Sequence, residues 1–513
     1  MKSLCPPALF VSLLCVAIML LVLNAPEPAG LSNNGTIGDF YRVIQPCGIE
    51  FIDSLSYHDR YTPTYVMTYA RGGGISLQQK LCRFLQTDYS VYKYLTSQFA
   101  AVKLAKIFSA VSNRIAGKPT ALFQMFWMGL IYTVLFGFAI YLILRFIFRR
   151  FGRVIFLFAS AVFCFAFCDQ GYLLYFNSFY GEAAQYVFTF LCIGLFLHLM
   201  EMEKQSLPRF VLYIAVLLMA ASKAAYAPVG ILFSFAPLSL LPPKRVPRMA
   251  VLSLMTIVTG LIVIFSAMFT PQWMEDDTNF NAVFSGVLKY SRTPEQDLAE
   301  LDLDPSLSVL KGSEAYQKKY PIDILSGNFQ KGFYDKIGKG KIALFYARHP
   351  MRWLRVMRMS ADYAKSIRPM YLTNTQNPSA PIEQSHRFSV WESVRAWSGI
   401  SSFPVTVDVF ILTFALIVYI IAFAEAPAGT GAPLACLLGT MAASALYNFL
   451  IPYISNGVCD LAKHMFGFVH FYDLLVFILL GTVIQKLEGR LKNKNYSTMP
   501  PSTTRSSGFT ASP

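Results

Sequence analysis

Long apolar segments recur along this chain, and they restrict its fold more than any short motif does. A helix of roughly 17–25 apolar residues can cross a bilayer, because it satisfies its backbone hydrogen bonds internally. Of the 513 residues, 55% are hydrophobic and 14% are charged, whereas soluble domains carry about 25% charged residues. We therefore predict an all-α integral membrane protein with about ten transmembrane helices. The predicted spans are residues 8–23, 121–144, 154–167, 183–200, 210–221, 225–241, 249–269, 404–423, 433–453 and 467–484.

Lysine and arginine residues in the short loops predict which side of the membrane faces the cytoplasm. Cytoplasmic loops are enriched in these residues. With ten spans, three basic segments fall on the same side as the N-terminus, so we predict that this side is cytoplasmic. The basic residues are Arg145, Arg149, Arg150 and Arg153, then Lys244, Arg245 and Arg248, and finally Lys486, Arg490, Lys492 and Lys494.

This topology divides the chain into six parts. Lys2 precedes the first span and no convincing small-residue cleavage site follows it, so we expect an uncleaved anchor. Two hydrophilic loops are too long to be simple connectors, and the Ser/Thr/Pro-rich tail is expected to be disordered. The parts are the anchor at 1–24, the first extracytoplasmic loop at 25–120, spans two to seven at 121–269, the second extracytoplasmic loop at 270–403, spans eight to ten at 404–485 and the cytoplasmic tail at 486–513.

Charge and cysteine content exclude some function classes. The net charge of +15 belongs to loops beside apolar spans rather than to a compact basic domain, so no nucleic acid partner is expected. Most of the nine cysteines lie in or beside apolar spans, where a free thiol behaves as a small hydrophobe. Cys47 and Cys82 share the first outer loop, which leaves a disulfide between them open. No cysteine or histidine spacing fits a metal site.

A polar and aromatic stretch at residues 169–182 separates two apolar spans. Ionisable groups next to hydrocarbon are expensive and usually have a function. The predicted topology places this stretch outside, together with three other loops that carry acids and bases. The polar residues of the four loops are Asp39 and Arg42; Asn177, Tyr180 and Glu182; Lys223 and Tyr226; and Asp460, Lys463 and His464.

Each of these groups also has a purely structural interpretation. Asp39 suits a turn, and Glu182 would stabilise a helix N-terminus. Lys223 can extend to the membrane interface, and Asp460 and His464 can pair on one helix face. These interpretations explain poorly why all the groups occur on one side of the membrane.

The acids and bases of these four loops are chemically suited to catalysing attack on a lipid-linked phosphate ester. A carboxylate such as Asp39 can take a proton from an acceptor hydroxyl. Lys223, Lys463 and His464 can stabilise negative charge on a phosphate leaving group. The aromatic residues within 172–180 can pack against a sugar ring, so the site would hold a sugar joined to a phosphate.

The second outer loop contains a basic helical segment at residues 341–367. Arg348, Arg352 and Arg355 share one face of this helix. The pattern is typical either of a helix that binds lipid phosphate at a membrane surface or of a solvated loop helix, and the sequence does not separate the two.

Six short motifs occur in order along the chain. They are GDFYR at 38–42, YFNSFYGE at 175–182, FNAVFSGVL at 280–288, DLAELDLD at 297–304, RFSVW at 387–391 and DLAKH at 460–464. Together they resemble bacterial polytopic glycosyltransferases of the GT-C superfamily, in particular the hexose transferases of surface polysaccharide pathways. The resemblance covers most of the chain up to the last span.

This resemblance implies a polyprenyl-phosphate sugar donor, an active site on the extracytoplasmic face and Asp39 as the catalytic base. The superfamily often has two adjacent acids in the first outer loop, whereas Gly38 precedes Asp39 here. Glu50 and Asp53 are candidates for the second acid, and a requirement for a divalent metal stays open. The residues expected to bind substrate or phosphate are Arg42, Asn177, Tyr180, Glu182, Lys223, Asp460, Lys463 and His464.

The predicted protein is thus a multi-pass glycosyltransferase of the cell membrane. It would move a hexose from a polyprenyl-phosphate carrier to a glycan or lipid acceptor on the extracytoplasmic face, with membrane lipids as further partners. A lipid-linked sugar flippase or transporter is the alternative. A transporter would place polar groups along a path through the membrane, whereas these groups are all predicted on one side.

Overall fold

The structure is a computed structural model of the whole chain. The residues that it describes are 4–24, 32–33, 38–51, 66–69, 94, 96–202, 206–240, 248–268, 270–369, 372–373, 386, 388–423 and 431–497.

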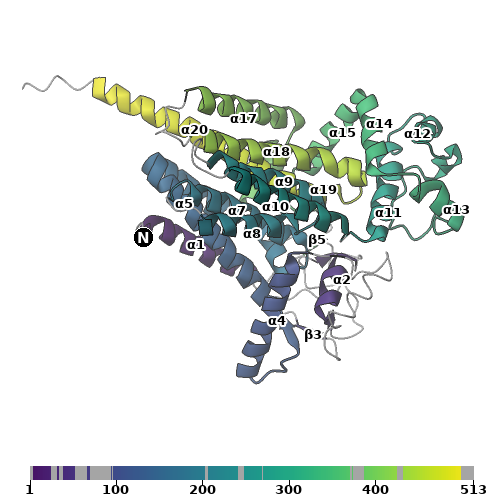
Figure 1. The fold of residues 1–513 in the computed structure, drawn as a ribbon, viewed down its shortest axis with the longest axis horizontal. Helices are drawn as coiled ribbons and strands as arrows, with labels where there is room; N and C mark the ends of the chain where they lie inside the picture. Colours follow the sequence, from purple (N-terminus) through teal and green to yellow (C-terminus); the bar gives the residue numbers. More distant parts are fainter. Residues whose placement is uncertain are drawn as a thin grey trace, which may run out of the picture.

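The long helices form a bundle with α7 at its centre (Figure 1). Every residue of α7 except His198 is buried, as expected for a helix that is apolar on all sides. Helices α5, α8 and α20 pack against it. The bundle consists of α1 (Pro6–Leu23), α5 (Phe126–Val162) with η4 (Phe163–Phe167), α7 (Gly181–Leu199), α8 (Ser206–Ala220), η6 (Ala224–Tyr226), α9 (Ala227–Phe235), η7 (Ala236–Leu240), α10 (Arg248–Met268), α17 (Phe403–Phe423), α18 (Gly431–Asn456) and α20 (Phe466–Ser497).

Helix α5 is a helical hairpin. Gly152 breaks it with φ 85° and ψ −175°, a conformation that glycine adopts without a side-chain clash. The two arms then lie beside the same part of α1: Ser12 Oγ donates to Gly137 O at 2.7 Å, and Cys15 Sγ lies 3.7 Å from Cys164 Sγ. This bend produces the second and third apolar segments that the sequence predicts.

The apolar segments confirm a multi-pass helical membrane protein. Each predicted span coincides with helix over most of its length, and six helical stretches of the described chain are long and apolar enough to cross a membrane. Three shorter apolar helices are Leu207–Ala220, Ala224–Leu240 and Ser253–Ile262, so ten complete crossings remain a prediction. The six long stretches are Pro6–Leu23, Phe126–Phe167, Gly181–Leu199, Phe403–Ala422, Gly431–Asn456 and Phe466–Leu491.

The bundle has two chemically different ends. At one end, which we call the basic end, Arg145 and Arg149 of the α5 hairpin lie 3.2 and 3.5 Å from Glu201 Oε2, just beyond the last residue of α7. Glu182 stands at the first turn of α7, so the length of that helix separates it from Glu201. We call the end that contains Glu182 the site end.

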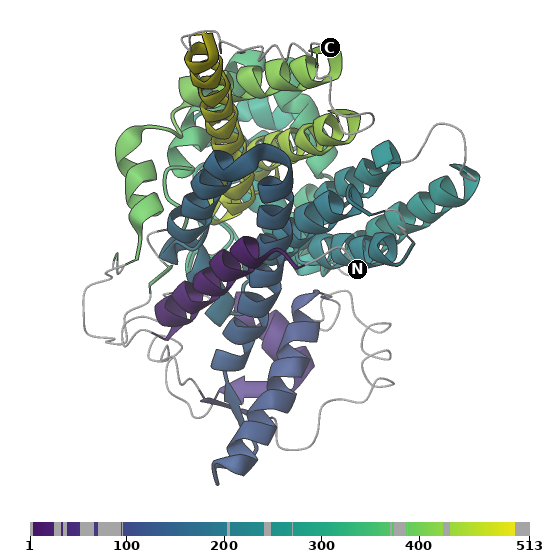
Figure 2. The ribbon, with the colours of Figure 1, turned by 90° about the vertical axis from the view of Figure 1, so that its left-hand side faces the viewer.

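Two insertions lie at the site end and contain most of the remaining elements. The first projects below the bundle in Figures 1 and 2 through α2 and α4. It contains β1 (Ser32–Asn33), α2 (Gly38–Ile44), η1 (Gln45–Cys47), β2 (Ile49–Phe51), β3 (Val66–Tyr69), α4 (Gln98–Ile115) and β4 (Leu122–Gln124). The second contains α11 (Gln272–Phe280), η8 (Asn281–Val287), α12 (Pro294–Glu300), η9 (Pro305–Leu310), α13 (Gly327–Phe329), η10 (Gln330–Tyr334), α14 (Lys339–Arg348), α15 (Pro350–Tyr363), β5 (Leu372–Thr373) and α16 (Val390–Ser398).

Short strands form a small sheet within the first insertion and join the two insertions to each other. β2, β3 and β4 form an antiparallel sheet in which Glu50 pairs with Thr68 and Met67 with Phe123. β1 pairs with β5, so the first insertion is linked to the second. These strands were not expected from the sequence, which predicted an all-α fold. They are only two to four residues long, too short to carry an alternating pattern.

The basic segment at 341–367 is two helices rather than one. α14 ends at Arg348 and α15 begins at Pro350, because proline lacks the N–H that a continuous helix needs and is well suited to a first helical position. Arg352 forms two 2.8 Å bonds to the Asp297 carboxylate, and Arg348 lies 3.8 Å from Glu300. Two of the three arginines therefore have carboxylate partners within the protein.

Two buried ion pairs hold α16, one to the bundle and one to the chain segment after α15. Arg395 NH1 contacts Asp473 Oδ1 of α20, and both side chains are fully buried. Asp473 Oδ2 also accepts hydrogen bonds from Tyr172 Oη and Trp391 Nε1, each at 2.6 Å. Arg368 binds Glu392 through Nε and NH2 at 3.1–3.3 Å. The charged face of α16 is therefore turned inward, whereas Trp397 is 89% exposed.

Candidate functional site

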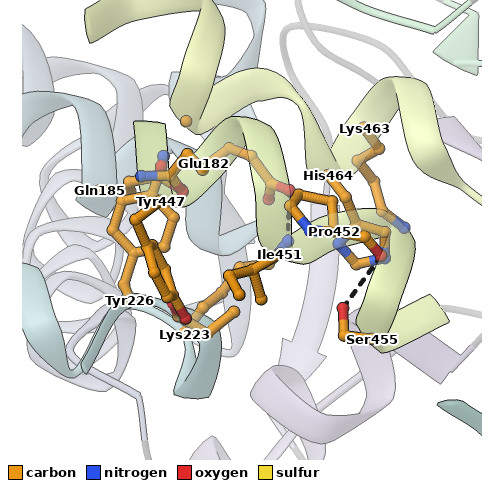
Figure 3. Close-up of a pocket in the computed structure, with 13 residues that line it drawn as sticks. Glu182, Gln185, Lys223, Tyr226, Tyr447, Ile451, Pro452, Ser455, Lys463 and His464 are labelled. Atoms are coloured by element: carbon orange, nitrogen blue, oxygen red, sulfur yellow. Dashed lines mark hydrogen bonds and ion pairs between the residues drawn. The ribbon is translucent and has the colours of Figure 1, made fainter. Parts of the chain in front are cut away.

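A pocket at the site end brings together residues from five segments of the chain (Figure 3). It contains about 400 Å³ of empty space, counting its open mouth. Glu182, Lys223, Lys463 and His464, all predicted as site residues, line it. The remaining lining residues are Gln185, Ala225, Tyr226, Tyr447, Asn448, Ile451, Pro452, Ser455 and Gly467.

One wall of the pocket contains a buried ion pair. Lys223 Nζ contacts Glu182 Oε1, and only 1% of the Glu182 side chain is exposed. Gly181 permits this approach, because a Cβ there would lie 2.7 Å from the Ser222 carbonyl oxygen and 2.8 Å from Lys223 Cγ. The lysine charge is thus already balanced by a carboxylate, and Lys223 is better placed to hold Glu182 than to bind a phosphate.

The opposite wall is α19 (Leu461–His464) with the turn before it. Gly457 has φ 58° and lies against the backbone of η8, while Asp460 adopts a left-handed conformation with φ 52°. Lys463 Nζ donates to Asp460 Oδ2 at 2.9 Å and lies 5.6 Å from the centre of the Tyr180 ring. Asp460 is 31% exposed, so this pair is close to solvent.

His464 is positioned by two asparagines. Asn281 Nδ2 donates to Asn456 Oδ1 at 2.9 Å, and Asn456 Nδ2 lies 3.3 Å from His464 Nε2 and 2.7 Å from Cys459 O. Asn281 Oδ1 accepts from Ala315 N at 2.8 Å. This chain of amides, which the sequence did not reveal, connects the histidine to the second insertion.

Three polar atoms in the buried part of the pocket have no hydrogen-bond partner among the residues that the structure describes. They are Glu182 Oε2, Gln185 Nε2 and Tyr226 Oη. Gln185 follows Glu182 by three residues, so both side chains lie on the same face of α7. A free acceptor, a free amide donor and a hydroxyl are the groups that bind hydroxylated ligands.

Gly467 provides the space that the Tyr226 hydroxyl occupies. A Cβ at position 467 would come within 3.0 Å of both Tyr226 Oη and Asn448 Oδ1. We expect Gly467→Ala to lower the free energy of unfolding by about 1–3 kcal/mol, the usual cost of overpacking. Gly489→Ala is the control, because a Cβ there meets nothing within 4 Å in the same helix and alanine favours helix. Thermal unfolding should move in opposite directions for the two variants; equal shifts would contradict the packing.

The helix that contains Asp39 lies next to this pocket. Phe40 packs against Phe179 and Tyr180, with ring centres 5.3 and 4.9 Å away, and the Tyr180 ring is the one beside Lys463. The Asp39 backbone belongs to α2, but its side chain lies outside the described residues. The same holds for the Glu50 side chain and for all of Asp53 and Cys82.

Four predicted binding residues lie outside the pocket lining. Tyr180 and Asp460 stand beside Lys463, whereas Asn177 and Arg42 have structural contacts. Asn177 Nδ2 donates to Leu23 O at 3.1 Å at the C-terminus of α1. Arg42 lies over the Tyr94 ring at 4.8 Å, with NH1 3.8 Å from Met274 Sδ. Asn177 thus stabilises a helix end, whereas Arg42 joins α2 to α11.

The aromatic stretch at 172–180 is buried inside the fold. Tyr172 stacks on Tyr186 at 4.8 Å, and Tyr175 packs on Phe466 at 4.7 Å. Phe176 packs against Tyr132 at 5.7 Å. These rings therefore belong to the packed core of the fold. The sequence could not distinguish this structural role from sugar binding.

Lys339 is a further lysine beside the pocket that sequence reasoning missed. Its Nζ donates to Ser455 O at 2.6 Å and to Thr278 Oγ1 at 2.9 Å, and Ser455 lines the pocket. Burial lowers the pKa of Lys339 to about 7. No sequence signal separates this lysine from others in the second insertion, because only the fold brings it to α18.

Asp169, at the start of the polar stretch, caps two helices at once. Its Oδ1 accepts from Gly171 N at 2.7 Å, and its Oδ2 accepts from Trp391 N at 2.7 Å and Glu392 N at 3.2 Å. Burial and the Glu392 carboxylate raise the pKa of Asp169 to about 7. The carboxylate therefore connects α6 (Gln170–Leu173) to α16 and titrates near neutral pH.

This raised pKa predicts a pH-dependent stability. The unfolded pKa is about 3.9, so the folded state binds the extra proton between about pH 4 and pH 7, and stability from this group falls as pH rises through that range. We expect Asp169→Asn to abolish this decrease in stability with rising pH. The difference in Tm between the variant and the wild type should increase from pH 5 to pH 8. Parallel Tm curves would contradict the assignment.

The described residues contain no group of three or more histidine, cysteine or carboxylate side chains arranged to hold a metal ion. The side chains of Asp39 and Asp53 lie outside the described residues, so a divalent metal site in the first insertion stays a prediction.

The fold and the pocket define a multi-pass helical membrane protein with a polar site at one end of its bundle. The chain belongs to the family of the YfdI N-terminal transmembrane domain, whose model matches residues 1–500. No curated protein and no solved structure matches the chain.

Proposed function

We propose that this protein transfers a hexose from a polyprenyl-phosphate carrier to a glycan or lipid acceptor on the extracytoplasmic face of the membrane. The supporting observation is the pocket, in which Glu182, Lys223, Lys463 and His464 converge from separate segments of the chain. Family membership independently supports a membrane protein, and the resemblance to GT-C enzymes rests on the ordered motifs.

In the proposed reaction, the acceptor hydroxyl oxygen bonds to the anomeric carbon of the donor sugar. The bond between that carbon and the phosphate oxygen breaks, and Asp39 takes the hydroxyl proton. The leaving group is polyprenyl phosphate, whose added negative charge Lys463 and His464 would stabilise. A lysine held beside a partly exposed carboxylate can exchange that partner for the phosphate.

The site is also suited to a donor that stays partly in lipid. Pocket residues Tyr447, Ile451 and Pro452 belong to α18, a helix long and apolar enough to cross the membrane. A polyprenyl chain could remain among such helices while its phosphate reaches α19. This one-sided arrangement favours surface chemistry over transport across the bilayer.

The test is a transfer assay on the purified full chain in lipid vesicles. Radiolabelled polyprenyl-phosphate hexoses would be supplied with glycan and lipid acceptors, and labelled products separated from the donor. We expect transfer by the wild type and a loss of at least about 100-fold for Asp39→Asn, with Asp302→Asn as an exposed matched control. Full activity of Asp39→Asn would remove Asp39 as the base, and absence of transfer by the folded wild type would overturn the proposed reaction.

A further inference from the structure

The unpartnered atoms of the pocket indicate where each part of a ligand binds. Glu182, Gln185 and Tyr226 are 1%, 1% and 4% exposed, yet Glu182 Oε2, Gln185 Nε2 and Tyr226 Oη have no partner within the described part of the chain. Leaving buried polar atoms unpaired costs folding free energy. Three unpaired polar atoms lie in the residues that line one pocket. This clustering indicates a ligand that completes their hydrogen bonds.

Charge divides the pocket into two unlike parts. At the α7 wall, the Lys223 charge is balanced by Glu182. At the α19 wall, Lys463 and His464 stand together, Asp460 is the partly exposed partner of Lys463, and Lys339 lies behind Ser455. Each wall therefore contains one lysine–carboxylate pair, but the pair on the α19 wall is partly exposed and stands beside a histidine and a second lysine. An anion would bind on that side, while the α7 side offers neutral and acidic hydrogen-bonding groups.

We propose that Glu182, Gln185 and Tyr226 form a subsite for the hydroxyl groups of the donor hexose, with its phosphate at Lys463 and His464. This inference rests on the proposed function and adds the orientation of the donor. Glu182 Oε2 accepts a hydrogen bond from one sugar hydroxyl, and Gln185 Nε2 donates to a sugar oxygen. Tyr226 Oη can do either. Lys223 is a positioning residue that holds the Glu182 carboxylate in place.

Hydrogen bonds to hydroxyl groups make this subsite the element that selects the sugar. A site with buried donors and acceptors rejects analogues that leave those groups unpaired. Gln185 and Tyr226 therefore decide which hexose is accepted. The isoprenyl chain and the phosphate are common to all such carriers and are bound elsewhere.

The test compares four ligands that differ only in the sugar. Binding of radiolabelled isoprenyl-phosphate glucose, galactose and mannose, and of isoprenyl phosphate alone, is measured on the purified full chain. The variants are Gln185→Met and Tyr226→Phe. The control is Tyr132→Phe, because Tyr132 Oη is also buried and unpartnered among the described residues but does not line the pocket.

We expect both pocket variants to bind the preferred isoprenyl-phosphate hexose about tenfold more weakly and isoprenyl phosphate within about twofold of the wild type. Removing a buried hydroxyl that has no partner should leave Tm unchanged or higher. Tyr226→Phe should therefore lose hexose affinity without losing stability, a combination that a purely structural tyrosine would not produce. Tyr132→Phe should bind both ligands normally.

Other outcomes overturn the inference in distinguishable ways. Unchanged hexose binding by both pocket variants would show that water alone satisfies these atoms. Equal weakening of both ligands would show that the residues shape the pocket without contacting the sugar. If the wild type binds neither ligand, the proposed function itself fails, and the subsite fails with it.

Discussion

Replacing Asp473 with leucine is expected to lower the free energy of unfolding by about 3–5 kcal/mol. The substitution leaves the fully buried Arg395 guanidinium without its carboxylate and removes the acceptor for Tyr172 Oη and Trp391 Nε1. An unpaired charge in the interior is among the most destabilising single defects. The effect would be measured as a shift of thermal unfolding, and of chaotrope unfolding where it is reversible, for the protein in detergent.

A double variant separates charge pairing from packing. Asp473→Leu combined with Arg395→Met removes both charges, and replacing a buried ion pair by apolar residues of similar size is often neutral or stabilising. We expect the double variant to recover most of the lost stability. Asp302→Asn is the surface control, because the Lys341–Asp302 pair is largely exposed and contributes little. A single variant as stable as the wild type, or a double variant less stable than the single one, would contradict this account.

The helices of the bundle were predictable because their signals are local. Apolar segments of sufficient length must be helical in a membrane, and Gly152 with its flanking arginines marks the bend of α5 in the sequence itself. Pro350 likewise marks the break between α14 and α15, although periodicity alone suggested one helix over 341–367. Turn and breaker residues were thus more informative about boundaries than the apolar pattern.

The site was predictable only in part, because its residues are joined by tertiary contacts. Glu182, Lys463 and His464 stood out as ionisable groups next to apolar spans, and the fold does bring them to one pocket. Gln185 carries no charge and was overlooked, although its spacing from Glu182 placed it on the same helix face. The sequence separation of 116 residues between Lys339 and Ser455 shows why no local pattern could assign that lysine.

One signal was present in the sequence and was not used. Asp473 interrupts the last apolar span, and an ionisable residue within a span is expensive unless it is paired. That argument predicts a buried cationic partner, although it does not identify Arg395, which lies 78 residues away. The same reasoning explains the burial of Asp169, whose carboxylate accepts hydrogen bonds from Trp391 N and Glu392 N at the start of α16.

Replacing Lys463 with methionine is expected to reduce the second-order rate constant of hexosyl transfer by about 10²–10³-fold, the usual loss when one group that stabilises developing charge is removed. Methionine keeps the apolar stem that packs beside Tyr180, and Asp460 retains access to solvent. The fold should therefore survive. Transfer from the radiolabelled carrier would be measured at several donor concentrations, together with Tm.

Two substitutions control this result. Lys463→Arg keeps a positive charge and should retain more activity than Lys463→Met, while Lys341→Met removes an exposed lysine of the second insertion and should be neutral. A loss confined to donor affinity would limit Lys463 to holding the carrier, whereas a loss that persists at saturating donor would show that it stabilises the leaving phosphate. Wild-type activity of Lys463→Met would remove Lys463 from the proposed phosphate site, because its charge would then be irrelevant to transfer.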